Sequence, residues 1–209
     1  MKNVIKVLLA ALLSSPAIPQ DETLFSGDIE SGWYGGAFIE VGQVNDATGF
    51  LVGGQGGWVI NHRFVVGAKG YMLTNPTDVE GLENIDVGFG CGGAFLEYII
   101  ASNQLVHISI ESMIGIGGVY NDVKDYTLYH DPLEYTGDAC FVMEPGAHLM
   151  LNVAKNFRIG VGATYRFVYG LDYDPGAPYR IINGDDYQNI SNSSLTGVSA
   201  QIILKFGTF

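Results

Sequence analysis

The sequence lacks any apolar stretch long enough to cross a bilayer as a helix. Its longest run of that kind, residues 4–13, contains Lys6 and is well short of the ~20 residues that a spanning helix needs. Basic residues are also scarce, since 10 Lys and Arg stand against 22 Asp and Glu, for a net charge of −12. This acidity argues against nucleic acid as a partner, because phosphates are bound through Lys and Arg.

The first residues have the pattern of an export signal. Lys2 and Lys6 give a positive start, residues 4–13 are mostly apolar, and Ser14–Ala17 offers small residues for cleavage. Neither cysteine lies near this region, so no lipoprotein anchor is expected. We expect three segments: a signal peptide over residues 1–20 that is cut near 17–20, an N-terminal periplasmic segment over 21–32, and a barrel over 33–209.

The rest of the chain alternates between two kinds of side chain with the period of two that is typical of β-strands. Charged side chains fall on one phase only, and the other phase carries aromatic, aliphatic and small residues. A soluble sheet would place its charges in water, whereas an apolar exterior around a charged lumen is typical of a barrel in lipid. We predict an all-β fold, an eight-stranded antiparallel up-and-down transmembrane β-barrel. Its expected strands are Trp33–Val44, Gly49–Ile60, Phe64–Leu73, Val87–Ile100, Gln104–Gly118, Ala139–Val153, Phe157–Tyr169 and Thr196–Phe206.

The connections between these strands alternate between tight turns and longer loops. The tight turns lie at 61–63, 101–103 and 154–156, and each contains Asn, which tolerates the left-handed backbone of a short hairpin. The segments at the other end are 45–48, 74–86, 119–138 and 170–195. They hold 14 of the 22 acidic residues, only two basic residues, and many tyrosines. Short periplasmic turns and long external loops are the arrangement of bacterial outer-membrane barrels.

The tight turns also set registers between neighbouring strands. They place Gln55 opposite Lys69, Glu97 opposite His107, Glu144 opposite Arg166, and Asn152 opposite Arg158, always with both partners on the lumen face. Four lumen glutamates then meet four lumen bases, so a plugged, salt-bridged interior is expected. The predicted lumen network consists of Glu40, Gln55, Lys69, Glu97, His107, Glu111, Glu144, His148, Arg158, Arg166 and Lys205.

Aromatic residues on the outward phase gather at two levels, as expected of the girdles at the two faces of a bilayer. Trp33, Trp58, Phe64, Tyr98 and Phe157 lie near the tight turns, and Phe50, Tyr165 and Phe167 lie nearer the long loops.

Two positions break the pattern. Pro145 cannot donate a ladder hydrogen bond, so a bulge is predicted at Pro145-Gly146. Phe209 is out of phase with the outward residues Ile202, Leu204 and Phe206, and a bulge near Gly207 would bring it back into phase.

The C-terminal strand, which ends Ile202-Ile203-Leu204-Lys205-Phe206-Gly207-Thr208-Phe209, completes a resemblance to a known class. The chain resembles the small eight-stranded bacterial outer-membrane barrels that include the OmpA transmembrane domain and OmpX. The resemblance covers 33–209 in architecture and not in motif. It implies a monomer in the outer membrane of a Gram-negative cell, in contact with lipid and lipopolysaccharide. It also implies that Phe209 is recognised by the barrel assembly machinery.

One set of residues suggests catalysis. His107, Ser109 and Glu111 occupy alternate positions of one strand, and the spacing loosely resembles the His-x-Ser pair of outer-membrane lipid A deacylases. Those enzymes act from the barrel exterior, whereas the phase here places all three residues inside, with His107 bonded to Glu97. We therefore expect no enzyme, with lipid A modification as the enzymatic alternative.

Other functions remain open at this point. A narrow channel gated by breakage of a Glu144–Arg166 pair is the transport alternative. A soluble barrel that carries an apolar ligand would require the charged phase to face outward. The acidic loops lack the spacing of a dedicated Ca²⁺ loop, so neither metal nor cofactor is expected. The preferred function is structural, or surface interaction with an extracellular ligand through the acidic, Tyr-rich loops.

The two cysteines, Cys91 and Cys140, point inward on strands that have a third strand between them. Two strand spacings of ~4.8 Å exceed the ~6.8 Å reach of a disulfide between Cα atoms, so two free thiols are expected.

Overall fold

The computed structural model describes residues 29–45, 47–79, 82–123, 137–173 and 190–209. The predicted signal peptide and its cleavage site lie outside these ranges. Most of the predicted N-terminal segment and much of the two longest loops do so as well.

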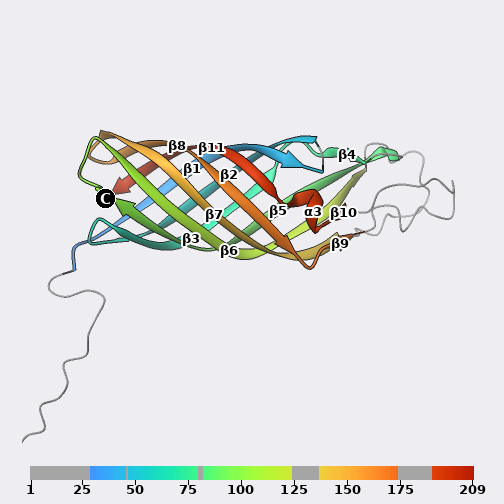
Figure 1. Cartoon of the computed structure of the whole chain (residues 1–209), viewed down its shortest axis with the longest axis horizontal. Coiled ribbons are helices and arrows are strands. Elements are labelled where there is room, and N and C mark those ends of the chain that lie inside the picture. The colour runs from blue at the N-terminus through green and yellow to red at the C-terminus, as the bar shows by residue number, and fades with distance from the viewer. Residues whose placement is uncertain (1–28, 46, 80–81, 124–136, 174–189) are drawn as a thin grey trace, which may run out of the picture.

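Eight long antiparallel strands form a closed barrel, which confirms the predicted fold (Figure 1). Each strand pairs with the next long strand along the chain, and the pairing of β1 with β11 joins the two ends of the sheet. The strands are β1 (Ser31–Val44), β2 (Ala47–Ile60), β3 (Phe64–Leu73), β5 (Leu82–Ile100), β6 (Val106–Val123), β7 (Gly137–Ala154), β8 (Phe157–Tyr169) and β11 (Gly197–Thr208).

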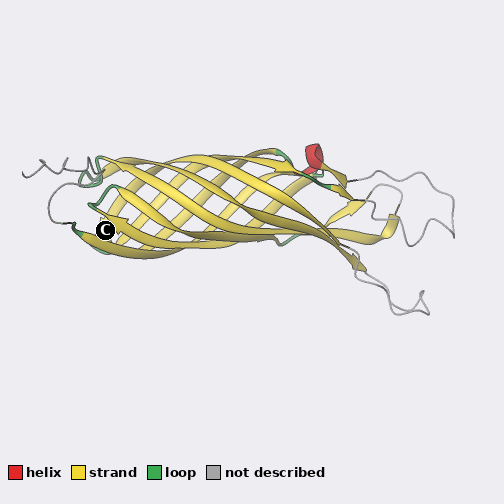
Figure 2. Ribbon diagram, turned by 90° about the horizontal axis from the view of Figure 1, so that it is seen from below, coloured by secondary structure: helices red, strands yellow, loops and turns green. Residues whose placement is uncertain are grey.

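Four short elements lie at the loop end, away from the C-terminus (Figures 1 and 2). They are β4 (Thr77–Val79), which pairs with β5, the two-stranded ribbon β9 (Asp172–Tyr173) and β10 (Ile190–Ser191), and the single-turn helix α3 (Asn192–Leu195). Each of them is too short to show a period, so the sequence pattern does not predict them. No helix in the described ranges is long and apolar enough to span a bilayer.

Two of the three predicted hairpin registers are confirmed, each at the cross-strand pair that the sequence predicts inside the lumen. Gln55 lies opposite Lys69, and Asn152 lies opposite Arg158. The third register is wrong, because Glu97 lies opposite Glu111 and not opposite His107. The connection there is longer than predicted: the Gln104 amide donates to the Ala101 carbonyl at 2.9 Å, and β6 begins only at Val106. The resulting shift is an even number of residues, so every side chain keeps its predicted face.

The predicted bulge at Pro145 is also wrong. β6 pairs with β7 in one unbroken register through Ser112 and Pro145. On the other side of β7, the same register holds before and after Glu144 and Pro145, and only the pairs at these two residues are missing. The proline is therefore accommodated by omitting pairs on one side of the strand. The irregularity of β7 lies instead at Val153, between Asn152 and Ala154.

The outer surface is apolar over the length of the strands. Exposed large hydrophobic residues occur on every long strand, with Trp33 at 65% exposure and Ile116 at 74%. All the described charged residues in the middle of the strands are buried, among them Glu40, Lys69 and Arg166. The barrel thus has the inverse polarity of a soluble sheet protein.

A closed ladder without a free edge predicts resistance to detergent. In SDS without heating we expect the protein to stay folded and to migrate faster on a gel than the boiled sample, because all eight strands must separate together. Identical mobility before and after boiling, in protein extracted from membranes, would contradict a closed barrel.

Candidate functional site

The centre of the lumen is built around one buried lysine. Lys69 of β3 places its Nζ 3.0 Å from Glu111 Oε1 and 2.9 Å from Glu144 Oε1, and 3.6 Å from Glu40 Oε1. The side chains of all four residues are at most 1% exposed. The Tyr71 hydroxyl donates to the other oxygen of Glu144. Four strands thus meet at one ammonium group, which lies within 3.6 Å of three buried carboxyl groups.

A second cluster surrounds Glu97, closer to the tight turns. The Tyr34 hydroxyl donates to Glu97 Oε2 at 2.5 Å, Lys205 Nζ donates to Oε1 at 2.6 Å, and the Ser109 hydroxyl also donates to Oε1. Gln55 joins the two clusters, because its Nε2 donates to Tyr34 Oη at 2.8 Å and to Glu111 Oε2 at 3.2 Å. The interior therefore contains one connected polar network and not a set of separate pairs.

All eleven predicted lumen residues lie inside the barrel, and none is more than 7% exposed. Two predicted pairings are wrong. Glu144 is held by Lys69 and Tyr71 and makes no ion pair with Arg166, and His107 makes no hydrogen bond with Glu97 or any other described residue. Tyr34, Tyr71 and Gln201 also belong to the network, and Gln201 Nε2 donates to Glu40 Oε1 at 2.5 Å. All three lie on the inward phase of their strands. Tyrosine is also a common outward girdle residue, so its presence in a strand does not by itself predict a polar role in the lumen.

Buried side chains fill the lumen towards the loop end. Arg166 of β8 donates from Nε to the Leu195 carbonyl at 2.7 Å and from Nη2 to the Gln43 carbonyl at 3.3 Å. Its guanidinium carbon lies 5.2 Å from the centre of the Phe89 ring. The Asn45 amide donates to the Ser194 carbonyl at 2.6 Å, so α3 is held beside the end of β1 at this rim. Buried apolar side chains pack beneath and around it: Val44, Leu51, Leu73, Val87, Phe89, Val119, Val142, Val168, Leu171, Tyr173, Ile190 and Leu195.

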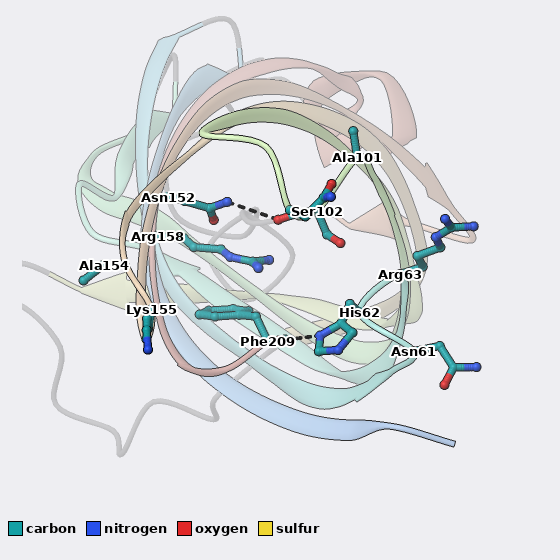
Figure 3. A pocket seen from close by; sticks show the side chains of 11 residues that line it. Asn61, His62, Arg63, Ala101, Ser102, Asn152, Ala154, Lys155, Arg158 and Phe209 are labelled. Atoms are coloured by element: carbon teal, nitrogen blue, oxygen red, sulfur yellow. Dashed lines mark hydrogen bonds between the residues drawn. The ribbon is translucent and has the colours of Figure 1, made fainter. Parts of the chain in front are cut away.

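The turn end is different, because a cavity of about 730 Å³ opens there (Figure 3). Arg158 and the C-terminal residue Phe209 point into it, and the guanidinium carbon of Arg158 lies 3.8 Å from the centre of the Phe209 ring. The same ring stacks on Tyr34 at 5.6 Å. His62 Nδ1 lies 2.6 Å from the Phe209 carbonyl oxygen, and its Nε2 lies 2.6 Å from Glu30 Oε2.

The predicted bulge near Gly207 is therefore absent. The register of β1 with β11 runs without a shift to the pair of Trp33 and Thr208. Phe209 keeps its inward phase and packs against the core at the mouth of the barrel. Stacking on Tyr34 and Arg158 gives the ring a place that the sequence pattern did not suggest.

Comparison with solved structures identifies this architecture. Neisserial surface protein A from Neisseria is 12% identical, with a TM-score of 0.54 over 86% of this chain and 99% of that chain. The outer membrane protein OprG from Pseudomonas aeruginosa is 10% identical, with a TM-score of 0.51 over 85% of this chain and 95% of that chain. The N-terminal β-barrel domain of Pseudomonas aeruginosa OprF is 9% identical, with a TM-score of 0.50 over 83% of this chain and 96% of that chain. The chain has the fold of the small eight-stranded outer-membrane barrels. No protein-family model matches it, and no curated protein matches its sequence.

In a small outer-membrane barrel the outward aromatic residues are expected at the bilayer interfaces. Trp33, Trp58 and Tyr98 near the turns, and Phe50 and Tyr165 near the loops, are between 39% and 65% exposed. Phe64, Phe157 and Phe167 are half-buried because each packs against another aromatic ring, for example Phe157 on Phe206 at 4.4 Å. Both sets thus lie on the outer surface of the barrel.

The catalytic alternative does not assemble as a site. Ser109 is fully buried and its hydroxyl is committed to Glu97, while His107 and Glu111 make no contact with it that would activate the oxygen. An acyl chain on the outside of the barrel would have no path to this hydroxyl. Among the described residues there is also no cluster of His, Cys, Asp or Glu that suits a metal ion, and Cys91 and Cys140 are free thiols.

Ser109→Ala tests this conclusion directly. We expect the acylation of lipid A in cells that produce the variant to match that of cells with the unaltered protein, as measured by mass spectrometry. The expected cost is to stability, about 1.5–3 kcal/mol for one hydrogen bond to a charged group. An acylation pattern that changes only when Ser109 is present would overturn the structural role.

Proposed function

We propose that this protein resides in the outer membrane as a non-conducting barrel and that its role is structural or one of surface contact through its acidic loops. The observation that carries this proposal is the filled lumen. Buried apolar side chains occupy its loop end, and the Lys69 and Glu97 clusters fill the interior below them. Eight strands enclose a space that side chains alone can fill.

The outer surface supports the location. A continuous apolar exterior with aromatic residues near both ends is costly in water and favourable in lipid. Lipid and lipopolysaccharide would therefore be the immediate surroundings of the strands. Because the barrel is closed and offers no free strand edge to a second copy, we propose a monomer.

The loop sequences support a role in surface contact. They hold 14 of the 22 acidic residues, and tyrosines are frequent among them. Rigid amphipathic rings provide contact area at small entropic cost. The acidic side chains would favour a cationic partner, or divalent cations that bridge them to lipopolysaccharide phosphates.

The C-terminal segment would meet the assembly machinery before the barrel closes. In the folded protein the Phe209 ring lies between Tyr34 and Arg158, so it would be accessible to that machinery only in the unfolded chain. Phe206 is 54% exposed, so Phe206 and not Phe209 is the aromatic residue of this segment that lies on the outer surface.

Two measurements test the role. In planar bilayers the purified protein is expected to give no single-channel steps.

In the native host, a deletion strain should lose surface contact or resistance of the envelope to SDS with EDTA, and the intact gene should restore it. A gene in which Asp131, Glu134, Asp185 and Asp186 are changed to Asn or Gln should fail to restore it. A matched variant, Lys155→Gln at the turn end, should restore it fully. Steady conductance, or full restoration by the loop variant, would overturn the proposal.

A further inference from the structure

The cavity at the turn end contains a buried cation without a partner. Arg158 is 7% exposed, yet its guanidinium group makes no hydrogen bond or ion pair with any described residue. The other three lumen bases are each bonded: Lys69 to Glu111 and Glu144, Lys205 to Glu97, and Arg166 to two carbonyls. A buried charge is normally paired, because its desolvation costs several kcal/mol. Among the four lumen bases, Arg158 is thus the one without a hydrogen-bond partner in the described part of the chain.

The Arg158 guanidinium group has a fixed orientation and faces the cavity. One face of the guanidinium lies on the Phe209 ring at 3.8 Å, a cation–π contact that fixes its orientation. Arg158 is one of the residues that line the cavity. Figure 3 shows Arg158 beside Asn152 and pointing into the middle of the opening towards Ser102. The Asn152 side chain holds this rim by donating to the carbonyls of Ser102 at 3.1 Å and Gln104 at 2.6 Å.

The acidic groups nearby are bonded to other residues. Glu97, whose charge acts on Arg158, accepts hydrogen bonds from Tyr34, Lys205 and Ser109. His62 links the Phe209 backbone oxygen to Glu30, with both contacts at 2.6 Å, and no described acidic group forms an ion pair with Arg158. Arg63 and Lys155 also line the cavity, and Figure 3 shows their side chains pointing away from its centre. They add positive potential at this end of an acidic molecule, which favours the approach of anions.

The geometry points to an oxyanion site in this cavity, with the Arg158 guanidinium binding a phosphate or carboxylate group of a small solute. A planar guanidinium matches such a group with two parallel N–H···O bonds, which is why arginine is preferred for this task. The cavity of about 730 Å³ leaves room for the rest of a small organic anion. Because it lies within the circumference of the barrel, a soluble anion would enter along the barrel axis from the turn side (Figure 3).

The test uses the full barrel in dodecyl maltoside micelles, which contain no phosphate. Inorganic phosphate and succinate are added in separate titrations, and the NMR signal of the Arg158 Nε–Hε group is followed. We expect a saturable shift with at least one of these anions. Arg158→Gln should weaken binding of that anion at least tenfold, as followed at the amide of Ser102, whereas Lys155→Gln should change it less than threefold. Arg158→Lys keeps the charge without the planar fork and should weaken binding severalfold.

Controls separate folding from binding and identify the source of the anion. The mobility shift on heating in SDS shows whether each variant is folded. If Arg158→Gln does not fold, Arg158→Lys is used in its place. Dihexanoyl phosphatidylglycerol is titrated in parallel. A shift with this lipid alone would support the same site and assign it to a lipid headgroup. No shift of Arg158 with phosphate, succinate or the lipid, or equal binding by folded Arg158 variants, would overturn the site.

Discussion

Lys69→Met is expected to lower the free energy of unfolding by about 3–5 kcal/mol, because it breaks a buried ion network by removing one partner. Glu40, Glu111 and Glu144 would lose the ammonium group that lies within 3.6 Å of all three. Methionine fills a similar volume, so the effect would come from charge and not from a cavity. The measurement is urea unfolding of the barrel in lipid vesicles, followed by the fluorescence of Trp33 and Trp58.

Lys155→Met is the matched control, since Lys155 is exposed in a tight turn and should change stability by no more than about 0.5 kcal/mol. A triple variant distinguishes charge from packing. It combines Lys69→Met with Glu111→Gln and Glu144→Gln, which removes two of the carboxylates left without the lysine. This variant should recover part of the lost free energy of unfolding. If the triple variant is no more stable than Lys69→Met alone, the network contributes by packing and its charges are secondary.

Much of the fold could be predicted because side-chain direction in a strand depends only on parity. The β5–β6 register was wrong by four residues, and yet Glu97, His107 and Glu111 all remained inside. An even error leaves every face unchanged, so the in–out assignment is more secure than any single pair. The bounds of β3 and β8 were predicted correctly because turn residues flank both strands closely.

The partners within the lumen could not be predicted, because they come from strands across the barrel. Lys69 of β3 meets Glu111 of β6 and Glu144 of β7, and no hairpin register relates these strands. The meeting depends on strand tilt and on the stagger of the closed sheet, which a period of two does not reveal. Phe209 and α3 were missed for a related reason. Each is held at one end of the barrel through contacts that exist only once the barrel is closed.

Val161→Arg tests whether the outer surface of the barrel faces lipid. Val161 is 51% exposed and lies in the middle of β8, between Phe157 near the turns and Tyr165 near the loops. In a bilayer an arginine at this depth should cost about 2–4 kcal/mol, because its charge would face hydrocarbon. On a barrel surrounded by water, the same change would cost no more than about 0.5 kcal/mol.

Ile29→Arg is the matched control for this variant. Ile29 is similarly exposed, at 56%, but precedes the first strand, so an arginine there should be close to neutral in both surroundings. Unfolding by urea in phosphatidylcholine vesicles gives the two free energies under identical conditions. A loss of stability for Val161→Arg with little change for Ile29→Arg would place the middle of the strands in lipid. Equal stabilities would mean that the apolar exterior faces something other than a bilayer, and the barrel would then have to be explained as a soluble protein whose outer face binds an apolar partner.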